Sequence, residues 1–240
     1  MKITVFNGSP KGERSNTNIM VQEFLAGCES VGAETENIFL AKKELKHCIG
    51  CFTCWIKTPG KCVHKDDMAE MIETYLNSDI IVFASPVYIG GVTGLMKDFL
   101  DRLLPTADPR IGKTKDGVTC HYKRYDKTHK YVLISNCGFP EQMHFEYFDS
   151  CFKYLELVTE DRILARIYRG QGEMLGIDHP MLKLLLNDYK NTLRQAGKEI
   201  VLKGKLSDET IFKLEQPLVP YDQYVGMANK HFDEALEKIK

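Results

Sequence analysis

Short apolar runs and segments of helical periodicity alternate along the first two thirds of the chain. The apolar runs predict five strands, at residues 2–7, 35–40, 79–84, 131–135 and 163–167. Apolar side chains three or four positions apart predict helices at residues 18–31, 66–77, 93–104, 141–158, 180–196 and 222–239. Strands that alternate with helices are typical of a parallel sheet covered by helices on both faces. The pattern therefore predicts an α/β fold with a doubly wound, five-stranded parallel sheet.

The length of 240 residues fits a single domain of this kind. We assign residues 1–200 to it, with a cysteine loop at 48–62 and a polar insertion at 105–130. Residues 201–240 form a C-terminal extension whose apolar positions are spread among turn signals. Because the sheet already has its covering helices, we expect this extension to belong to the same domain or to wrap the surface of a neighbouring subunit.

The charge balance excludes two classes of partner. Lys and Arg total 32 against 33 Asp and Glu, so no global field attracts nucleic acid or an anionic membrane surface. The first residues, MKITVFNGSP, do not resemble a signal peptide, and no stretch approaches the roughly 20 apolar residues of a membrane span. We therefore expect a cytoplasmic protein, in which a structural disulfide is disfavoured.

The stretch CIGCFTCWIKTPGKC holds four of the eight cysteines in the spacing C-x2-C-x2-C-x7-C. Four thiolates in so short a segment suit a 4Fe-4S cluster. They suit a structural zinc ion equally well, and redox thiols or a vestigial motif are the remaining interpretations. The four residues are Cys48, Cys51, Cys54 and Cys62.

The segment NGSPKGERSNTN, between the first strand and the first helix, is rich in small hydrogen-bond donors. A helix N-terminus and such donors bind phosphate well, and Lys11 and Arg14 add positive charge. The segment matches neither the dinucleotide fingerprint nor the nucleoside-triphosphate loop. The alternative is an ordinary loop whose Ser and Asn residues only cap the helix.

Two further loops follow the third and fourth strands. The first, ASPVYIGGVTG, combines Pro86 and the pair Gly90-Gly91 with the aromatic face of Tyr88, so its backbone can lie flat against a ligand. The other is SNCGFP, at residues 135–140. In a doubly wound sheet of strand order 2-1-3-4-5, the loops after strands one and three flank the switch point where flavodoxin binds FMN. A phosphate loop beside a flat loop suits one phosphate tail and one tricyclic ring.

Three segments resemble the flavodoxin-like NAD(P)H-dependent FMN reductases, and among them most resemble the iron–sulfur flavoproteins. These segments are GSPKGERSNTN, SPVYIGGVTGLMKDFLDR and the cysteine motif, so the resemblance covers residues 1 to about 104, with a weaker match at 135–140. The resemblance implies that FMN phosphate binds in the first loop, the isoalloxazine on the second, and that the third completes the ring pocket. The residues implied are Ser9, Lys11, Ser15, Asn16, Thr17 and Asn18; Pro86, Val87, Tyr88, Ile89 and Gly90; and Asn136, Cys137 and Gly138. It also implies a 4Fe-4S cluster on the four cysteines.

The resemblance implies an FMN-dependent oxidoreductase that moves electrons from NAD(P)H or a ferredoxin-like donor to a small-molecule acceptor, in a homodimer or homotetramer. The flavin itself carries this chemistry, so we assign no general acid, general base or nucleophile. One alternative is a cluster-free NAD(P)H-dependent FMN or quinone reductase with a vestigial or zinc-binding motif. The other is a non-enzymatic zinc-binding interaction module, which the acidic run HKDDMAE after the motif disfavours.

Overall fold

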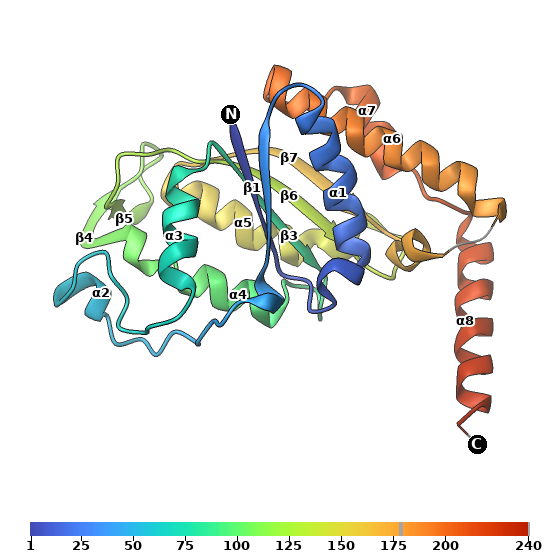
Figure 1. Ribbon diagram of the computed structural model, residues 1–240, viewed down its shortest axis with the longest axis horizontal. Helices are drawn as coiled ribbons and strands as arrows, with labels where there is room; N and C mark the ends of the chain where they lie inside the picture. The colour runs from blue at the N-terminus through green and yellow to red at the C-terminus, as the bar shows by residue number, and fades with distance from the viewer. Residues whose placement is uncertain (178–179, 240) are drawn as a thin grey trace.

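The central element of the computed structural model, which describes residues 1–177 and 180–239, is a parallel sheet. Its strands are β1 (Lys2–Asn7), β2 (Glu34–Phe39), β3 (Ile80–Pro86), β6 (Lys130–Asn136) and β7 (Arg162–Arg169). They lie in the order β2-β1-β3-β6-β7, and each neighbouring pair is parallel. This confirms the predicted flavodoxin-like sheet of order 2-1-3-4-5. The three central strands are almost fully buried because helices cover both faces (Figure 1).

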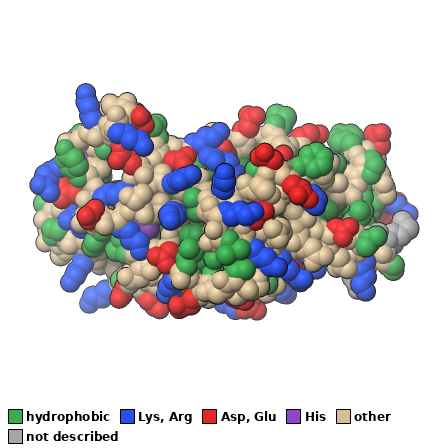
Figure 2. Space-filling model, turned by 90° about the horizontal axis from the view of Figure 1, so that it is seen from above, with side chains coloured by type: hydrophobic (Ala, Val, Ile, Leu, Met, Phe, Trp, Pro, Cys, Tyr) green, Lys and Arg blue, Asp and Glu red, His purple; other side chains and the backbone are tan. Residues whose placement is uncertain are grey.

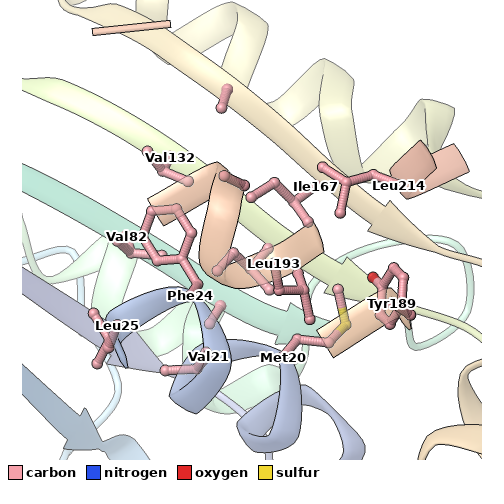
Figure 3. Close-up of a cluster of buried hydrophobic side chains, with 14 of the residues drawn as sticks. Met20, Val21, Phe24, Leu25, Val82, Val132, Ile167, Tyr189, Leu193 and Leu214 are labelled. Carbon is pink, nitrogen blue, oxygen red and sulfur yellow. The ribbon is translucent and has the colours of Figure 1, made fainter. Parts of the chain in front are cut away.

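One face of the sheet is covered by α1 (Asn16–Glu29) and α6 (Pro180–Lys203). Figure 3 shows Val21 and Phe24 of α1 and Leu193 of α6 packed together against the strands. The two helices cross with their backbones in contact, since a Cβ atom on Gly27 would lie 2.0 Å from the Arg194 carbonyl oxygen. The opposite face is covered by α3 (Met68–Asn77), α4 (Gly94–Asp101) and α5 (Glu146–Thr159).

Several short elements connect these layers. The turn of α2 (Thr53–Ile56) lies inside the cysteine loop. The 3-10 helices are η1 (Gly12–Arg14), η2 (Leu40–Lys42), η3 (Leu104–Thr106), η4 (Gln142–Phe145) and η5 (Gly172–Gly176). Helix α1 begins two residues before the predicted start because the Ser15 side chain caps it, whereas α5 begins five residues after its predicted start because η4 precedes it.

The polar insertion is an antiparallel hairpin, which the sequence pattern did not predict. It consists of β4 (Ala107–Lys113) and β5 (Thr119–Lys123), and β5 contacts α5. Most hairpin side chains are exposed or half-buried, so they show no clean alternation of apolar and polar positions. The hairpin lies beside α2 at the far side of α3 (Figure 1).

The C-terminal extension divides into two parts. Helix α7 (Asp208–Glu215), which was not predicted, buries Leu214 in the same core as α1 and α6, and Leu218 and Val219 follow it there. Helix α8 (Tyr221–Glu237) has no buried residue and extends away from the rest of the molecule (Figure 1). In residues 1–177 and 180–239, no helix has both the length and the apolar character needed to cross a membrane. Acidic and basic side chains are interspersed over the face in Figure 2.

Candidate functional site

The loop after β1 is held in shape by its own polar side chains. Ser15 Oγ donates to the Gly12 carbonyl at 2.8 Å and accepts from the Asn18 amide at 3.0 Å, which caps α1. The Asn18 side chain donates to the Glu13 carbonyl and accepts from Asn37, both at 2.9 Å. Two of the predicted phosphate ligands, Ser15 and Asn18, thus use their side chains to build the loop.

This loop offers a ligand its backbone N–H groups. The first N–H groups of a helix have no intrahelical partner, and the Ser15 cap satisfies only the one at Asn18. The amides of Asn16 and Thr17 therefore remain available at the positive end of a 14-residue helix. Nearby, Asn7 at the end of β1 holds the Ser9 amide at 3.1 Å, and its Nδ2 is buried without a partner among the described residues. This donor set fits a phosphate group.

A hydrogen bond joins the first predicted loop to the third. Asn136 Nδ2, at the end of β6, donates to Thr17 Oγ1 at 2.7 Å, and both side chains are buried. Asn136 lies 119 positions from Thr17 in the sequence, so only the sheet order brings them together. The sequence placed both residues at the site, but the structure adds that they contact each other.

Thr93, which the sequence analysis did not select, joins the first loop to the second. Its Oγ1 donates to the Gly8 carbonyl at 2.6 Å and accepts from the Met96 amide, so it also caps α4. The Thr93 amide donates to Ser85 Oγ at 3.1 Å, and the Ser85 carbonyl accepts from Ser135 Oγ at 2.7 Å. The three loops after β1, β3 and β6 are thereby connected at one edge of the sheet.

The loop after β3 presents its middle residues to solvent. The backbones of Tyr88 and Gly91 exchange two hydrogen bonds, of 2.9 and 3.0 Å, around a tight turn. At the tip of this turn Ile89 has a φ of 49° and is fully exposed, and Gly90 has a φ of 78°. A β-branched residue with positive φ is strained, and such strain tends to occur at ligand sites. The Tyr147 ring of α5 lies beside this turn, because a Cβ atom on Gly91 would be 3.3 Å from it.

The third loop supplies Cys137, whose side chain is buried. Its thiol lies 3.3 Å from the Phe139 carbonyl, and burial raises its pKa to about 11. Cys137 is therefore a neutral thiol near pH 7 and has no nucleophilic character there. The neighbouring Gly138 is exposed, and its carbonyl accepts a hydrogen bond from Tyr224 of α8.

A fourth loop, after β7, supports the other three and was missed in the sequence analysis. A Cβ atom on Gly172 would lie 2.9 Å from the Asn136 side chain, and one on Gly176 would lie 2.8 Å from Asn16 Oδ1. Gln171 has a φ of 56° and accepts hydrogen bonds from the backbone of residues 218 and 219. The glycine-rich segment RGQGEMLG directly after the fifth strand was the available signal.

The four cysteines of the motif lie in one neighbourhood. Cys54, on α2, is buried, Cys62 is half-buried, and Cys48 and Cys51 are exposed. Burial raises the Cys54 pKa, and the nearby charges of the other three thiolates raise it further. All four are free thiols, so the donor set has the number and type of ligands that a 4Fe-4S cluster takes. Across residues 1–177 and 180–239, no three His, Cys, Asp or Glu side chains surround a single metal-ion position.

The base of the cysteine loop is fixed to the domain by buried contacts. Arg102, which follows α4, donates to the Lys46 carbonyl at 2.6 Å and to both carboxylate oxygens of Asp66. In the middle of the loop, on α2, Trp55 Nε1 donates to the Leu104 carbonyl at 2.8 Å. The Trp55 ring also contacts His121 of the hairpin, with ring centroids 4.7 Å apart. The loop is therefore held at its base and at α2, while Cys48 and Cys51 stay accessible.

Comparison with known proteins agrees with this geometry. The family model of NADPH-dependent FMN reductases matches residues 1–117. An iron–sulfur flavoprotein of Methanocaldococcus jannaschii is 44% identical over 112 residues, which cover 47% of this chain and 55% of the relative. One from Archaeoglobus fulgidus is 40% identical over 143 residues, which cover 60% and 59%. The chain thus spans between half and two thirds of the length of these relatives.

Solved structures show the same fold at low sequence identity. An FMN-dependent NADH-azoreductase of Bacillus anthracis, solved with FMN, is 14% identical with a TM-score of 0.57, covering 83% of this chain and 99% of that one. A flavone reductase is 19% identical with a TM-score of 0.56, covering 87% and 67%. These similarities establish the fold, and the sequence matches show that residues 1–117 are similar to the NADPH-dependent FMN reductases.

Proposed function

We propose that the protein is an FMN-dependent oxidoreductase that takes electrons from NAD(P)H or a ferredoxin-like donor and delivers them to a small-molecule acceptor. The observation that carries this proposal is the junction of three loops at one sheet edge, where Asn136 bonds Thr17 and Thr93 bonds Gly8. Ligands of doubly wound sheets bind at this edge. The family match over residues 1–117 supports the flavin and the nicotinamide donor.

In this proposal the first loop holds the FMN phosphate. The amides of Asn16 and Thr17 donate to it at the N-terminus of α1, with the Ser9 hydroxyl and the Lys11 ammonium beside them. Ser15 keeps these donors in place by capping α1, and Asn18 does so by donating from its side chain to the Glu13 carbonyl. A phosphate therefore meets a loop that is already formed.

The other two loops hold the isoalloxazine ring. The backbone of residues 86–90 forms a platform, on which Tyr88 and Ile89 are open to solvent. Residues 136–138 close the ring pocket, and the neutral Cys137 thiol lets an uncharged ring approach. FMN, when bound, supplies the hydride and single-electron chemistry. The chain's own contribution is to position the ring and to leave one side of it accessible to donor and acceptor.

We further propose that Cys48, Cys51, Cys54 and Cys62 hold a 4Fe-4S cluster. The proposal is supported by the mutual proximity of the four free thiols and by the names of the relatives. A single zinc ion binds four sulfurs at about 2.3 Å from one point. The same four thiolates suit a zinc ion, so the iron and sulfide content decides between zinc and a cluster. A cluster-free FMN or quinone reductase with a vestigial motif is the alternative.

A homodimer or homotetramer is the assembly that we propose, with residues 1–200 as the flavin domain and residues 201–240 as its extension. Helix α8 is attached to the domain near its start by the half-buried Tyr224, and further along it presents Phe232 and Leu236, each about three fifths exposed. Exposed apolar side chains on such a helix favour contact with another copy.

The experiment that tests the function is an absorption spectrum of protein purified without oxygen, followed by stopped-flow reduction with NADH and NADPH. Flavin bands that bleach on mixing with either nucleotide support the reductase. A broad absorption in the visible range, together with four irons and four sulfides per chain, adds the cluster. Protein that contains no flavin and does not bind added FMN would overturn the proposal.

A further inference from the structure

A cavity of about 770 Å³ lies at the opposite edge of the sheet from the three flavin loops. His129 directly precedes β6, Asp161 directly precedes β7, and both line it, so the cavity lies at the amino ends of the strands. The β4–β5 hairpin forms one wall and α5 forms another. Cavities of this size bind small molecules in other proteins. Cys48 and Gly50 of the cysteine loop also line it, whereas the three flavin loops do not.

Its polar floor is a buried hydrogen-bond network. Tyr75 and Tyr131 share a hydrogen bond of 2.7 Å between their hydroxyl groups, and Tyr131 also donates to Asp161 Oδ2 at 2.5 Å. Asp161 Oδ1 accepts from Lys123 Nζ at 2.6 Å and from the His129 amide at 2.8 Å. The carboxylate is therefore fully satisfied by groups of this chain.

One atom beside this network lacks a partner. His129 is 5% exposed, its ring stacks parallel to that of Tyr131 at 6.3 Å, and its Nε2 is buried with no hydrogen bond in the described part of the chain. Buried ring nitrogens are normally bonded, because an unpaired one costs free energy. Burial lowers the pKa of His129, so the ring is uncharged near pH 7. A hydroxyl group can donate to or accept from a neutral ring nitrogen, so it suits either tautomer.

Besides Asp101 and His121, the remaining lining is largely apolar or aromatic. It includes Leu103, Leu155, Val158, Tyr122 and Tyr154. The two lysines at the cavity are already engaged, Lys123 with Asp161 and Lys127 with the Leu76 carbonyl. An anionic ligand would compete with these bonds, whereas a flat uncharged ring would pack on the aromatic walls.

We propose that this cavity is a second binding site, which takes a small neutral aromatic molecule and bonds its hydroxyl group to His129 Nε2. The site is separate from the flavin loops, and it borders the cysteine loop at Cys48 and Gly50. Its occupant is therefore expected to bind whether or not FMN is present.

Calorimetric titration of the purified full chain with 1-naphthol tests the proposal, with 1-methoxynaphthalene as the matched probe that cannot donate a hydrogen bond. We expect saturable binding of 1-naphthol, weaker binding of the methyl ether by about tenfold, and no dependence on added FMN. In His129→Phe the preference for the hydroxyl should disappear. Absence of saturable binding, or a preference that survives His129→Phe in a folded variant, would overturn the proposal.

A steric variant locates the site. Val158 lines the cavity from α5, whereas the neighbouring Leu157 does not line it and is 42% exposed. We expect Val158→Trp to weaken 1-naphthol binding by about tenfold or more, and Leu157→Trp to leave it unchanged. Circular dichroism establishes that both are folded. Equal affinities in the two variants would show that naphthol binds elsewhere, and the proposal would fail.

Discussion

Arg102 and Asp66 form a bidentate ion pair, with distances of 2.9 and 3.0 Å, in which both side chains are almost completely buried. Burial raises the pKa of the Asp66 carboxyl, but hydrogen bonds from Arg102 and from the backbone outweigh it and lower the pKa to about 2. The pair closes the base of the cysteine loop, because Asp66 also accepts from the Lys46 amide. This buried charge pair thus fixes the base of the segment that carries the four cysteines.

Replacing Arg102 by Gln should therefore destabilise the protein strongly. It leaves Asp66 buried without its partner, which costs about 3–5 kcal/mol and lowers the melting temperature by on the order of 10 °C. Arg110→Gln is the matched control, because the Arg110 side chain is exposed in its pair with Asp108. An exposed pair contributes about 0–1 kcal/mol. Equal melting temperatures in the two variants would contradict the assignment of the buried pair.

Thr17→Val should weaken FMN binding. The change keeps the shape of the side chain but removes the acceptor of the Asn136 amide, so the first and third loops lose their hydrogen bond. We expect the dissociation constant of FMN to rise by about five- to tenfold in fluorescence titration of the apoprotein. Thr192→Val on α6, whose hydroxyl bonds only within its own helix, should change nothing. An unchanged FMN affinity in Thr17→Val would contradict the assignment of the phosphate loop to the FMN site.

Cys51→Ser should separate the two proposed cofactors. The side chain lies in the exposed part of the cysteine loop, whereas the phosphate loop follows β1. Iron and sulfide content after anaerobic purification should fall by more than about half, since a cubane takes four thiolates. Bound FMN should remain at the wild-type level. Cys120→Ser on the hairpin is the control, and iron loss there equal to that in Cys51→Ser would contradict the ligand set.

Stability should fall as the pH decreases from about 6.5 toward 4, because of His129. Burial lowers its pKa from 6.5 to about 4, so in this window the unfolded chain binds a proton that the folded chain does not. The contribution is on the order of 1–3 kcal/mol. The neighbouring charges also act on the ring: Asp161 raises its pKa, whereas Lys123 and Lys127 lower it.

Urea denaturation of the wild type and of His129→Phe at pH 4.5 and 7 measures this effect. The free energy of unfolding of the wild type should decrease more between the two pH values than that of the variant. Asp66 affects stability at lower pH. Its contribution to the free energy of unfolding is complete above the unfolded pKa of 3.8 and is lost as the pH falls toward 2. An identical decrease in both proteins would show that His129 is not the group responsible.

Phe232→Ser combined with Leu236→Ser should weaken the proposed assembly. Both side chains lie exposed on α8 and support nothing within their own chain, so the monomer should keep its melting temperature. Light scattering should then report a smaller mass than for the wild type at micromolar concentration. A wild type that is already monomeric would contradict the assembly.

The sequence predicted the sheet because its central strands are nearly continuous apolar runs, as in DIIVFA and YVLIS. The hairpin at residues 107–123 was missed because most of its side chains are exposed, so no apolar face marks it. Strand order alone placed the three loops at one edge. It could not show that the Ser15 side chain caps α1 and that the Asn18 side chain bonds Glu13 and Asn37, because structural contacts of this kind and a phosphate site use the same residue types.

The cavity at His129 was beyond sequence reasoning for a different reason. His129 and Asp161 are 32 positions apart and lie at the starts of two strands, where no loop pattern drew attention to them. Thr93 could have been found, since a Thr at the start of a predicted helix is a strong cap signal. Its second role, the hydrogen bond to the Gly8 carbonyl, could not have been predicted, because it depends on the neighbouring strand.

The close crossing of α1 and α6 determines when this protein can complete its fold. Cys28 Sγ lies 3.5 Å from the Gly197 carbonyl, a contact between residues 169 positions apart. Until the ribosome has released the segment beyond residue 200, the apolar face of α1 and of the sheet has no cover. The phosphate loop starts the same helix and so forms in a nascent chain whose core is still open. Folding of this face is therefore expected to wait until α6 has emerged from the ribosome, and a chaperone that shields apolar surface would act on the N-terminal half.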